Sequence, residues 1–472
     1  MADVQSITLI GSVLVIAEIT GIFLATHVVM QPRSSQGTIA WFIALITMPL
    51  ITVPLYAVFG RTRFLGYTEA LRKAEASVGS RVREWIQRMN AVAAEPQPGL
   101  DAVEALCKNL TGIAFLRANR VELLIDGAAT YDAMINAIES ANDYVLVQFY
   151  IVRDDVVGRR LRQALIDQAR KGVRVQFLYD EIGSINLPQS YLDQMRDAGI
   201  AISGFKTTKG RSNRFQINFR NHRKLLIVDG QTGFIGGHNL GEEYLRYRDT
   251  HLKIDGPAAQ HIEFTFLKDW YWATQEIVQL EAPIKHAENS DQAVAIVNTG
   301  PAHAVRNCGI LYLTLISQAR TRLWITSPYF VPDDAMVVAL QAAARRGVDV
   351  RIILPDKADQ RFVEFASFTY YDDMLNSGVR LYRYRDRFMH QKIILVDDTV
   401  AGIGTVNLDN RSLYLNFEAT ALIADAAFIA QVAAMLAEDL SNSSLVLREH
   451  YSNKPLPFRV ASKIARLASP LL

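Results

Sequence analysis

One short phrase occurs twice in this chain. The stretches NHRKLLIVDG (221–230) and MHQKIILVDD (389–398) each contain a His, a Lys two positions later, an apolar run and then an Asp. The apolar run is rich in β-branched residues and predicts a buried strand, on which side chains alternate between the two faces. In each copy the His and the Lys therefore point the same way, and the Asp points the other way.

This repeat predicts a site for phosphodiester transfer. A lone His and Lys on a strand would more often be structural, but packing does not explain two copies of the pair. If the copies face each other, one imidazole can attack phosphorus while the other protonates the leaving oxygen. Ammonium and amide N–H groups suit phosphoryl oxygens. The site that we predict needs no metal and no cofactor, and it consists of His222, Lys224, His390 and Lys392, with Asn239 and Asn407 as phosphate ligands.

The elements that must position these residues are repeated as well. DYVLVQFYIVRDD (143–155) has the pattern of TRLWITSPYFVPDD (321–334), and both halves alternate predicted strands with helices before the His strand. Such alternation is typical of an α/β architecture. We predict two similar domains over 116–292 and 293–472, each a mixed sheet flanked by helices, packed face to face about a pseudo-twofold axis.

The N-terminal region differs in kind. ITLIGSVLVIAEITGIFLATHVVM (7–30) and TIAWFIALITMPLITVPLYAVFG (38–60) are each long and apolar enough to cross a bilayer core of ~30 Å as a helix. We predict a transmembrane helical hairpin over 1–62, with its second helix kinked at Pro49 and Pro54. The residues before the first apolar segment include no Lys or Arg, which argues against a cleaved signal peptide.

Basic residues orient this hairpin. Those that follow the second apolar segment are Arg61, Arg63, Arg72 and Lys73, whereas the connecting loop holds Arg33. By the positive-inside rule the large C-terminal part is expected in the cytoplasm. The region 63–115 is interpreted as a linker, in which 71–90 either lies on the membrane surface or forms a solvated connector helix.

A basic run precedes the first copy of the phrase. FKTTKGRSNRFQINFRNHRK (205–224) holds seven basic residues and no acidic one. We expect it to dock anionic lipid head groups, with a solubilising loop as the alternative. A nucleic-acid surface is a third interpretation, against which the two membrane segments argue. The residues expected to dock lipid are Lys206, Lys209, Arg211, Arg214 and Arg220.

Composition narrows the remaining possibilities. The chain has 472 residues, of which 50% are hydrophobic, and this is enough apolar material for more than one packed domain. Its formal net charge is +2. Cys107 and Cys308 are the only cysteines, so neither a disulfide framework nor a zinc site is predicted. His238 and His251 lie near the first phrase but have no counterpart in the second half, so we expect them to be structural.

These motifs resemble a known family. H-x-K-x4-D, followed by G-[GT]-x-N and duplicated within one chain, resembles the phospholipase D superfamily. The stretches RDTHLKIDGPA, SPYFVPDD and GTVNLDNRSLYLNFE and the closing ASPLL are similar, more specifically, to the bacterial cardiolipin synthases of that superfamily. The resemblance covers almost the whole chain and implies catalytic motifs made of His222, Lys224, Asp229, His390, Lys392 and Asp397.

The resemblance also implies how each His is oriented. In the family a carboxylate further along the same copy holds each catalytic His, and Asp249 and Glu418 occupy those positions for the first and second copy. Where many members have Ser, this chain has Gly237 and Thr405, so a hydroxyl contact is expected in one half only.

Parity on the strand limits the role of the motif aspartates. Asp229 and Asp397 point away from the side of the strand that bears the His and the Lys. We therefore expect them to be strand-end or turn residues rather than partners in proton transfer.

The reaction that the resemblance implies is cardiolipin synthesis. One phosphatidylglycerol gives its phosphatidyl group to a His, glycerol leaves, and the terminal hydroxyl of a second phosphatidylglycerol attacks. We predict that His222 is the nucleophile, because the basic run ends there, and that His390 is the general acid and base. The alternatives are a phospholipase D that hydrolyses, a lipid-binding scaffold with an inactive site, and a membrane-tethered nuclease.

The resemblance also sets the expected location and partners. The protein is expected in the bacterial inner membrane as a multi-pass protein with cytoplasmic catalytic domains. Its expected partners are the membrane and anionic phospholipids, namely phosphatidylglycerol and cardiolipin. We expect no nucleic acid and regard a homodimer as an open alternative.

Overall fold

The computed structural model describes residues 2–31, 34–210, 213–278, 283–303 and 305–472. Contacts divide the chain into two compact units, which we describe separately. The anchor unit comprises Met1–Thr68 and Thr207–Phe219, and the catalytic unit comprises Glu69–Lys206 and Arg220–Leu472.

Three apolar helices form most of the anchor unit: α1(Ala2–Val29), α2(Ser35–Thr47) and α3(Pro49–Phe59). Helix α1 packs against both α2 and α3, around a small core of Ala25, Val28, Leu45 and Tyr56. The two predicted apolar segments therefore do lie against each other. Among the described residues, the segment Leu9–Val29 of α1 is the one helical stretch that is both long and apolar enough to cross a membrane.

The second apolar segment is not one kinked helix, as we predicted, but two. The chain leaves helical geometry at Met48, where φ is −137° and ψ is 54°, and restarts at Pro49. Pro49 can begin a helix but disfavours helical geometry in the residue before it. Pro54 lies inside α3 without ending it. Gly21 of α1 faces this break, where a Cβ on it would lie 2.4 Å from the carbonyl oxygen of Leu45.

The catalytic unit begins with the rest of α4(Leu65–Asn90) and with α5(Asp101–Thr111). We left open whether 71–90 lies on a membrane or is solvated, and its Trp85 shows a third arrangement. The Trp85 indole is 2% exposed and packs 4.7 Å from the ring of Phe264, which lies on α9(Pro257–Thr274). This part of α4 is therefore a packed helix.

The first half of the catalytic unit alternates strands and helices up to a long helix. Its elements are β1(Leu116–Ile125), α6(Asp126–Glu139), β2(Tyr144–Phe149), α7(Val156–Arg170), β3(Arg174–Asp180), α8(Gln189–Asp197), β4(Ala201–Phe205), β5(Arg220–Asn221), β6(Leu225–Val228), β7(Thr232–Gly236), the 3₁₀ helix Glu242–Arg246, β8(Thr250–Asp255) and α9(Pro257–Thr274).

The second half repeats this order and adds C-terminal helices. Its elements are β9(Gln292–Thr299), α10(Asn307–Gln318), β10(Arg322–Thr326), β11(Phe330–Val331), α11(Asp334–Arg345), β12(Asp349–Pro355), α12(Arg361–Phe368), α13(Tyr371–Ser377), β13(Arg380–Tyr384), β14(Ile393–Val396), β15(Val400–Gly404), β16(Leu408–Asp409), α14(Asn410–Tyr414), β17(Asn416–Ala424), α15(Ala426–Ser441), β18(Ser443–Leu445), α16(Glu449–Ser452), α17(Leu456–Leu467) and the 3₁₀ helix Ser469–Leu471.

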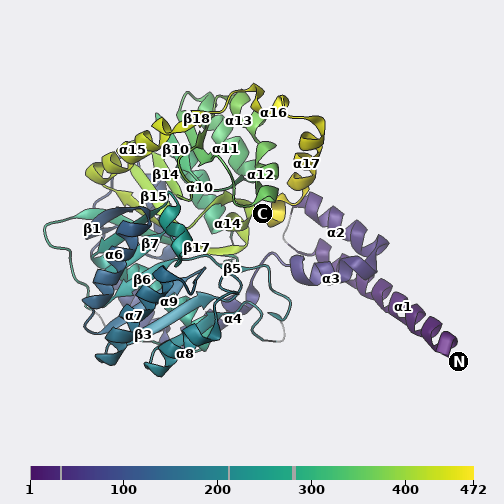
Figure 1. Ribbon diagram of the computed structural model, residues 1–472, viewed down its shortest axis with the longest axis horizontal. Coiled ribbons are helices and arrows are strands. Elements are labelled where there is room, and N and C mark those ends of the chain that lie inside the picture. The colour runs from purple at the N-terminus through teal and green to yellow at the C-terminus, as the bar shows by residue number, and fades with distance from the viewer. Residues whose placement is uncertain (1, 32–33, 211–212, 279–282, 304) are drawn as a thin grey trace. The chain divides into compact units, whose positions relative to one another are not determined.

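Both halves contribute to one mixed sheet, which confirms the predicted α/β class (Figure 1). The strand order β8-β7-β6-β2-β3-β4 of the first half is repeated as β17-β15-β14-β10-β12-β13 in the second. Strands β1 and β9 pair antiparallel between them, so the halves share a 16-stranded sheet rather than packing only face to face. Strand β15 also packs against β7 and β8, and β17 packs against β7.

Helix-capping aspartates explain part of the sequence echo. The second Asp of VRDD is Asp155, which caps α7 by accepting a hydrogen bond from the backbone N–H of Gly158 at 2.9 Å. In VPDD it is the first Asp, Asp333, that caps α11, by accepting from the N–H of Met336 at 2.8 Å. Such caps satisfy amide groups that the first helical turn leaves unpaired.

Candidate active site

Each motif His is bonded through its backbone to the opposite half. His222 follows β5, which pairs with β17 of the second half, and its N–H donates to the carbonyl of Phe417 at 2.9 Å. His390 donates its N–H to the carbonyl of Arg248, in the first half, at 2.8 Å. These two crossed contacts bring both histidines to the junction between the halves.

The carboxylates that hold the histidines are crossed as well. Nδ1 of His222 lies 3.0 and 2.9 Å from the two carboxylate oxygens of Glu418. Nδ1 of His390 lies 2.5 Å from Oδ2 of Asp249. We predicted that each His pairs with the carboxylate of its own copy, and that prediction is wrong. Because the backbone of each His crosses to the other half, the carboxylate within reach is the partner copy's.

Both motif lysines are buried in the same site. Lys224 is 0% exposed and Lys392 is 2% exposed, and each donates from Nζ to the backbone carbonyl of the His two positions earlier. The ammonium group of Lys224 also lies 5.4 Å from the ring centre of Tyr150. Strand parity thus places each Lys beside its His, as the sequence indicates.

Burial sets the protonation of the site. It lowers the pKa of His222 to about 4 and that of His390 to about 3, although the carboxylate beside each ring opposes the shift. The pKa values of Asp249 and Glu418 are lowered in spite of burial, because the imidazoles and lysines favour the charged carboxylates. Each ring is therefore neutral, donates from Nδ1 to a carboxylate, and keeps the lone pair on Nε2 for a reaction.

Burial also lowers the pKa values of the lysines. The pKa of Lys392 falls to about 8, and that of Lys224 falls well below its ordinary value. The carboxylates of Asp249 and Glu418 oppose this shift for both lysines, whereas the second ammonium group adds to it for Lys224. Two ammonium groups in one buried site suit a ligand that carries a negative charge.

The motif aspartates stand at turns, where strand parity places them. Asp229 has a φ of 51° and its carboxylate accepts from the backbone N–H groups of Asn142, Asp143 and Tyr144. Asp397 has a φ of 50° and accepts in the same way from the N–H groups of residues 320–322. Each Asp thus ties its turn to the start of the neighbouring strand, β2 or β10.

The two motif asparagines are not equivalent. Oδ1 of Asn239 accepts from the N–H of Ile151 at 3.1 Å, and its Nδ2 donates to the Tyr244 hydroxyl at 2.8 Å. Oδ1 of Asn407 is buried and has no hydrogen-bond partner among the described residues. Asn239 thus already serves to hold a loop and a tyrosine.

The neighbouring carboxylates explain why one half has Gly237 where the other has Thr405. A Cβ on Gly237 would lie 2.0 Å from Oδ1 of Asp249, so the carboxylate fills the space of a side chain. In the second half the Thr405 hydroxyl donates to Oε2 of Glu418 at 2.5 Å. Asn416 adds a donor to the same carboxylate at 3.1 Å. A hydroxyl contact is therefore present in one half, as predicted.

Aromatic rings surround the two imidazoles unequally. The ring of Tyr150 meets that of His222 edge to face, with centroids 5.0 Å apart. Around His390 lie Tyr244, Tyr247 and Phe388, with centroids 5.6, 5.7 and 6.0 Å away. Both histidines are 8% exposed, and His390 has aromatic rings on more sides than His222.

Two arginines that no sequence motif singled out brace the site. Arg223, between His222 and Lys224, points to the opposite face and forms a buried ion pair with Asp269 at 2.7 Å. Arg248 precedes Asp249 and pairs with Asp439 at 2.8 Å. The sequence does carry a signal for Arg223. It lies between His222 and Lys224 on a strand, so its side chain points away from the face that bears them.

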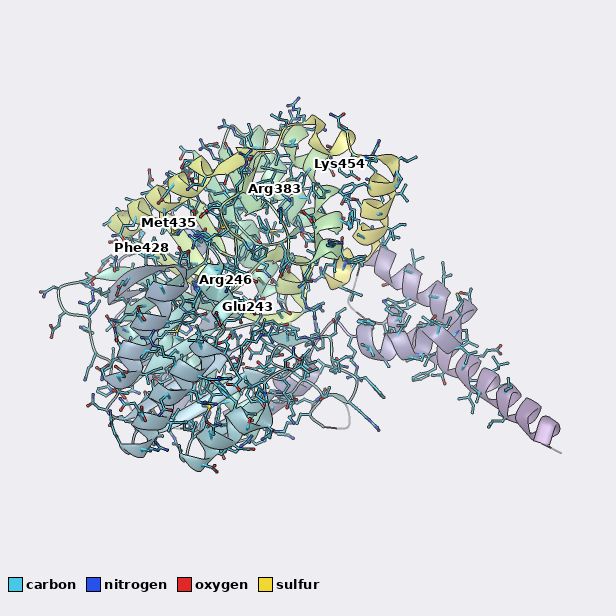
Figure 2. The ribbon with its side chains drawn as sticks, viewed as in Figure 1. Glu243, Arg246, Arg383, Phe428, Met435 and Lys454 are labelled. Atoms are coloured by element: carbon cyan, nitrogen blue, oxygen red, sulfur yellow. The ribbon has the colours of Figure 1, made fainter. Side chains whose placement is uncertain are left out.

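A methionine lies under the second imidazole–carboxylate pair. Met435 of α15, the helix that also carries Phe428 (Figure 2), has its sulfur 3.9 Å from the Thr250 hydroxyl and 3.8 Å from Nε2 of Gln391. Thr250 and Gln391 follow Asp249 and His390 directly in the chain. Helix α15 therefore supports this pair from behind.

His238 and His251 are placed as buried neighbours of each other. Both are 0% exposed, their ring centroids are 5.9 Å apart, and no ring nitrogen has a hydrogen-bond partner among the described residues. Burial lowers both pKa values. Neither histidine has a counterpart in the second half of the sequence.

The basic run is divided between the two units. Lys209 and Arg214 belong to the anchor unit, whereas Lys206 and Arg220 belong to the catalytic unit. Lys206 pairs with Glu181 at 2.8 Å. Arg211 lies outside the described residues. Arg220 lies near Tyr150, and its positive charge lowers the pKa of that phenol, which burial raises.

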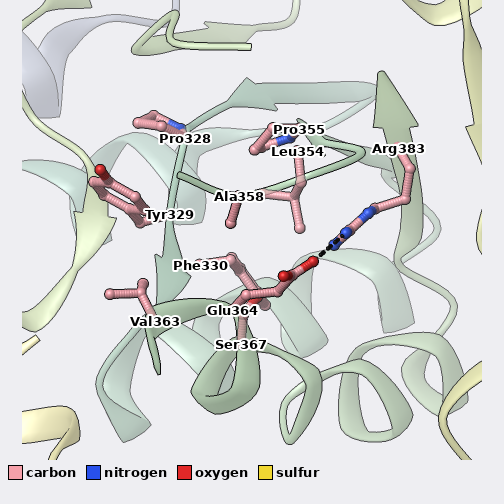
Figure 3. Close-up of a pocket in the computed structure, with 10 residues that line it drawn as sticks. All are labelled: Pro328, Tyr329, Phe330, Leu354, Pro355, Ala358, Val363, Glu364, Ser367 and Arg383. Atoms are coloured by element: carbon pink, nitrogen blue, oxygen red, sulfur yellow. Dashed lines mark hydrogen bonds and ion pairs between the residues drawn. The ribbon is translucent and has the colours of Figure 1, made fainter. Parts of the chain in front are cut away.

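A separate pocket opens at the carboxyl ends of β10 and β12 (Figure 3). Glu364 and Arg383 face each other on one wall as an ion pair at 2.8 Å. Tyr329 lines another part and bonds through its hydroxyl to Asp359 at 2.9 Å. No motif residue lines this pocket. Among the described residues, no group of three or more His, Cys, Asp and Glu is arranged to hold a metal ion.

Comparisons with known proteins agree on the type of domain. Residues 134–270 and 312–440 match the family model described as "Cardiolipin synthase, PLD-like domain". Residues 21–61 match the model described as "Phospholipase_D-nuclease N-terminal".

Curated relatives match along nearly their whole length. The chain is 42% identical to cardiolipin synthase A of Pseudomonas aeruginosa strain LESB58, over 99% of this chain and 97% of the relative. It is 43% identical to cardiolipin synthase A of Pseudomonas putida strain W619, over the full length of both. The crystal structure of phosphatidylserine synthase from Haemophilus influenzae Rd KW20 is similar in fold, with a TM-score of 0.61 at 19% identity, over 79% of this chain and all of that one.

Proposed function

The chain belongs to the cardiolipin synthase family of proteins with phospholipase D-like domains, and from that premise we propose that it transfers a phosphatidyl group from one phosphatidylglycerol to another. The observation that carries this proposal is the crossed site. Two neutral imidazoles, each bonded to a carboxylate of the other half, lie with two buried ammonium groups at one junction. Neither half alone holds a complete imidazole–carboxylate pair.

The first half-reaction forms a phosphatidyl-histidine. Nε2 of His222 attacks the phosphorus of a phosphatidylglycerol, the bond from phosphorus to the glycerol head-group oxygen breaks, and His390 gives that oxygen a proton. The bound phosphate raises the pKa of His390 by its negative charge, which favours the protonated ring. Lys224, Lys392 and Asn407 would stabilise the phosphoryl oxygens as charge develops on them.

The second half-reaction reverses these roles. His390, now neutral, takes the proton from the terminal hydroxyl of a second phosphatidylglycerol. The hydroxyl oxygen attacks phosphorus, the phosphorus–nitrogen bond to His222 breaks, and cardiolipin leaves. Water in place of that hydroxyl would give phosphatidic acid, so exclusion of water decides between synthesis and hydrolysis.

We assign the nucleophile to His222 on two grounds. Its carboxylate, Glu418, is held by Thr405 and Asn416 as well as by the imidazole, so the ring is firmly aimed. The basic run also ends at His222, so an anionic phosphodiester is drawn first to that side.

A direct test uses the purified full-length protein with phosphatidylglycerol in detergent. Mass spectrometry should find cardiolipin and glycerol in equal amounts. Phosphatidic acid with glycerol as the main products would mean a hydrolase, and no turnover would mean a scaffold. The same assay with the double variant His222→Ala/His390→Ala is the control for a contaminating enzyme.

We further propose that the anchor unit crosses the bacterial inner membrane twice and leaves the catalytic unit in the cytoplasm. Helix α1 is long enough to span, whereas α2 and α3, with 13 and 11 residues, reach only about 20 and 16 Å each. In series they match a core of about 30 Å, so the second crossing is a broken span.

This topology is testable with single cysteines, because Cys107 and Cys308 are both buried. In intact spheroplasts a membrane-impermeant maleimide should label Ser35→Cys, before α2, but should label Asn376→Cys, at the end of α13, only after permeabilisation. Equal labelling at both positions without permeabilisation would refute a cytoplasmic catalytic unit.

The basic run is proposed to collect anionic lipid near the site. Its segment 207–219 belongs to the same compact unit as the membrane helices, and the Phe219 ring packs 5.3 Å from that of Phe64. Phe215 and Ile217 in this segment are exposed beside Arg214. Apolar and basic groups together suit the interface of an anionic bilayer.

A further inference from the structure

The C-terminal helix α17 has two apolar faces, and one of them is open. Leu456, Val460, Ile464 and Leu467 follow one another at spacings that place them on a single side of a helix. They are 69%, 49%, 59% and 81% exposed, respectively. They form a continuous exposed stripe rather than scattered surface residues, and such a stripe calls for a partner.

The opposite face of α17 fixes the helix to the second half. The ring of Phe458 lies 5.0 Å from that of Phe365 and 5.2 Å from that of Phe368, both on α12. Ser462 and Ala465, on the same face, are buried. Because these contacts already hold the helix, the exposed stripe is not needed to fold it.

Basic side chains border the open stripe along one side. Arg459 and Lys463 lie next to it on the helix, and both are exposed. Arg466 stacks on the ring of Tyr370, with its guanidinium carbon 4.6 Å from the ring centre. Lys454 precedes the helix at the surface (Figure 2). Asp372 of α13 interacts electrostatically with Arg459 and Lys463, so cations outnumber this acidic neighbour.

The end of α17 is tied to the catalytic site. After the helix, the last residues reach α14, where Arg411 donates its N–H to the carbonyl of Leu472 at 2.7 Å and its guanidinium to that of Leu471 at 2.9 Å. Asn407, a proposed phosphate ligand, lies just before α14 in the chain. The open stripe is therefore attached to the segment that would meet a lipid substrate.

We propose that α17 lies in the surface of an anionic phospholipid bilayer, with its apolar stripe among the acyl chains and its basic residues at the phosphates. An exposed apolar stripe bordered by Lys and Arg is the pattern of helices that lie in the membrane interface. A second copy of this chain could also cover an apolar stripe, but it would bring the same cations against each other. The inference concerns membrane contact and stands apart from the proposed roles of the histidines.

Fluorescence of single-cysteine variants tests this contact in the full-length protein. Val460→Cys places an environment-sensitive probe on the stripe, and Cys107 and Cys308 are buried. Asn376→Cys is the matched control. Asn376 precedes the amino end of β13, whereas α12, on which α17 packs, follows the carboxyl end of the parallel strand β12, so the two probes lie toward opposite ends of these strands. Both variants are reconstituted in vesicles of phosphatidylglycerol and phosphatidylcholine, and in vesicles of phosphatidylcholine alone.

In vesicles that contain phosphatidylglycerol, the probe at 460 should shift its emission to shorter wavelength. Nitroxide lipids should quench it and aqueous iodide should not, whereas the probe at 376 should behave in the opposite way. The shift at 460 should shrink in phosphatidylcholine alone. Equal iodide quenching at both positions would overturn the proposal. Protection of position 460 from both quenchers, together with crosslinking between copies, would also overturn it and identify a dimer contact.

A second variant keeps the proposal testable through turnover. Val460→Glu/Ile464→Glu replaces exposed side chains, so folding is retained, and its cardiolipin synthesis should fall more in vesicles than in detergent micelles. An equal fall in both would contradict a role in membrane contact. No turnover by the unmodified protein would count against the proposed function, while the quenching result would still decide the membrane contact.

Discussion

The two halves of the catalytic unit carry the same motif but support it differently. In the first half, Gly237 leaves room for the short side chain of Asp249, which reaches across to His390. In the second half, Thr405 and Asn416 hold the longer Glu418, which reaches across to His222. A nearly symmetric sequence therefore produces two imidazoles in unlike settings, which suits a reaction that needs them in different roles.

The surroundings of the imidazoles differ in the same sense. Three aromatic rings lie around His390, whereas His222 has Tyr150 at its edge and the ammonium group of Lys224 close to that ring. A ring enclosed by aromatic groups loses its proton more easily. Under the proposed mechanism the duplicated phrase supplies both imidazoles, and the neighbouring segments give them the different surroundings that their roles require.

The largest effect is expected from removing either imidazole. His222→Ala and His390→Ala should each reduce phosphatidylglycerol turnover by at least ~10²–10⁴-fold, since the first lacks the nucleophile and the second lacks the acid and base. A substrate with a good leaving group needs no acid. With it, His390→Ala should form a stable adduct that peptide mapping places on residue 222. An adduct that persists in His222→Ala and maps to His390 would exchange the two roles.

The crossed carboxylates predict a specific pattern of damage. Asp249→Asn should disturb His390, lowering phosphatidylglycerol turnover by about 10²–10⁴-fold while still forming the adduct from the good-leaving-group substrate. Glu418→Gln should disturb His222 and slow formation of the adduct itself. Single-turnover labelling measures both. The reverse pattern would mean that each carboxylate serves the His of its own copy.

Changing the residues that hold these two carboxylates should give weaker versions of the same two defects. Gly237→Ala places a Cβ against Asp249, so turnover should fall by about 10²-fold with adduct formation retained, as for Asp249→Asn. Thr405→Val removes one hydrogen bond to Glu418 and should cost about 10–100-fold in adduct formation. Thr405→Ser keeps the hydroxyl and is the control. Equal defects in Thr405→Ser and Thr405→Val would show that the methyl packing, not the bond, is what counts.

The lysines should set the alkaline limit of activity. Lys392 has a pKa of about 8, so its charge is present below that pH and is lost above it, and kcat/KM should fall as the pH rises past 8. At the acid side kcat/KM should fall below about pH 4, where His222 takes up a proton. Lys392→Arg keeps its charge, so the alkaline limit should move up even though activity is lower. If the alkaline limit of kcat/KM moved only in Lys224→Arg, then Lys224, and not Lys392, would set that limit.

The smallest effect on chemistry is expected from the motif aspartates. Asp229→Asn and Asp397→Asn weaken bonds to three backbone N–H groups and should lower the free energy of unfolding by ~1–3 kcal/mol. The pH profile of the folded fraction should stay unchanged. Denaturant unfolding, paired with that profile, is the measurement. A shifted pH optimum in a stable Asp229→Asn protein would show that this carboxylate takes part in the reaction.

Sequence by itself determined most of the chemistry. The duplicated His and Lys pairs, their common face and the turn position of Asp229 and Asp397 all follow from strand parity, which is a local property. The α/β class likewise follows from local alternation of strands and helices. Apolar length identified both apolar N-terminal segments, and within the described residues Leu9–Val29 of α1 is long and apolar enough to cross a membrane. These features could be predicted because they depend on residues that are close together in the chain.

Tertiary structure alone decided how the two copies combine. His222 reaches Glu418 rather than Asp249 because its backbone bonds to β17, a contact between residues far apart in the sequence. The single shared sheet depends on the pairing of β1 with β9. The open face of α17 depends on the packing of its other face against α12. No local pattern encodes such contacts, since each is chosen by the free energy of the whole packed chain.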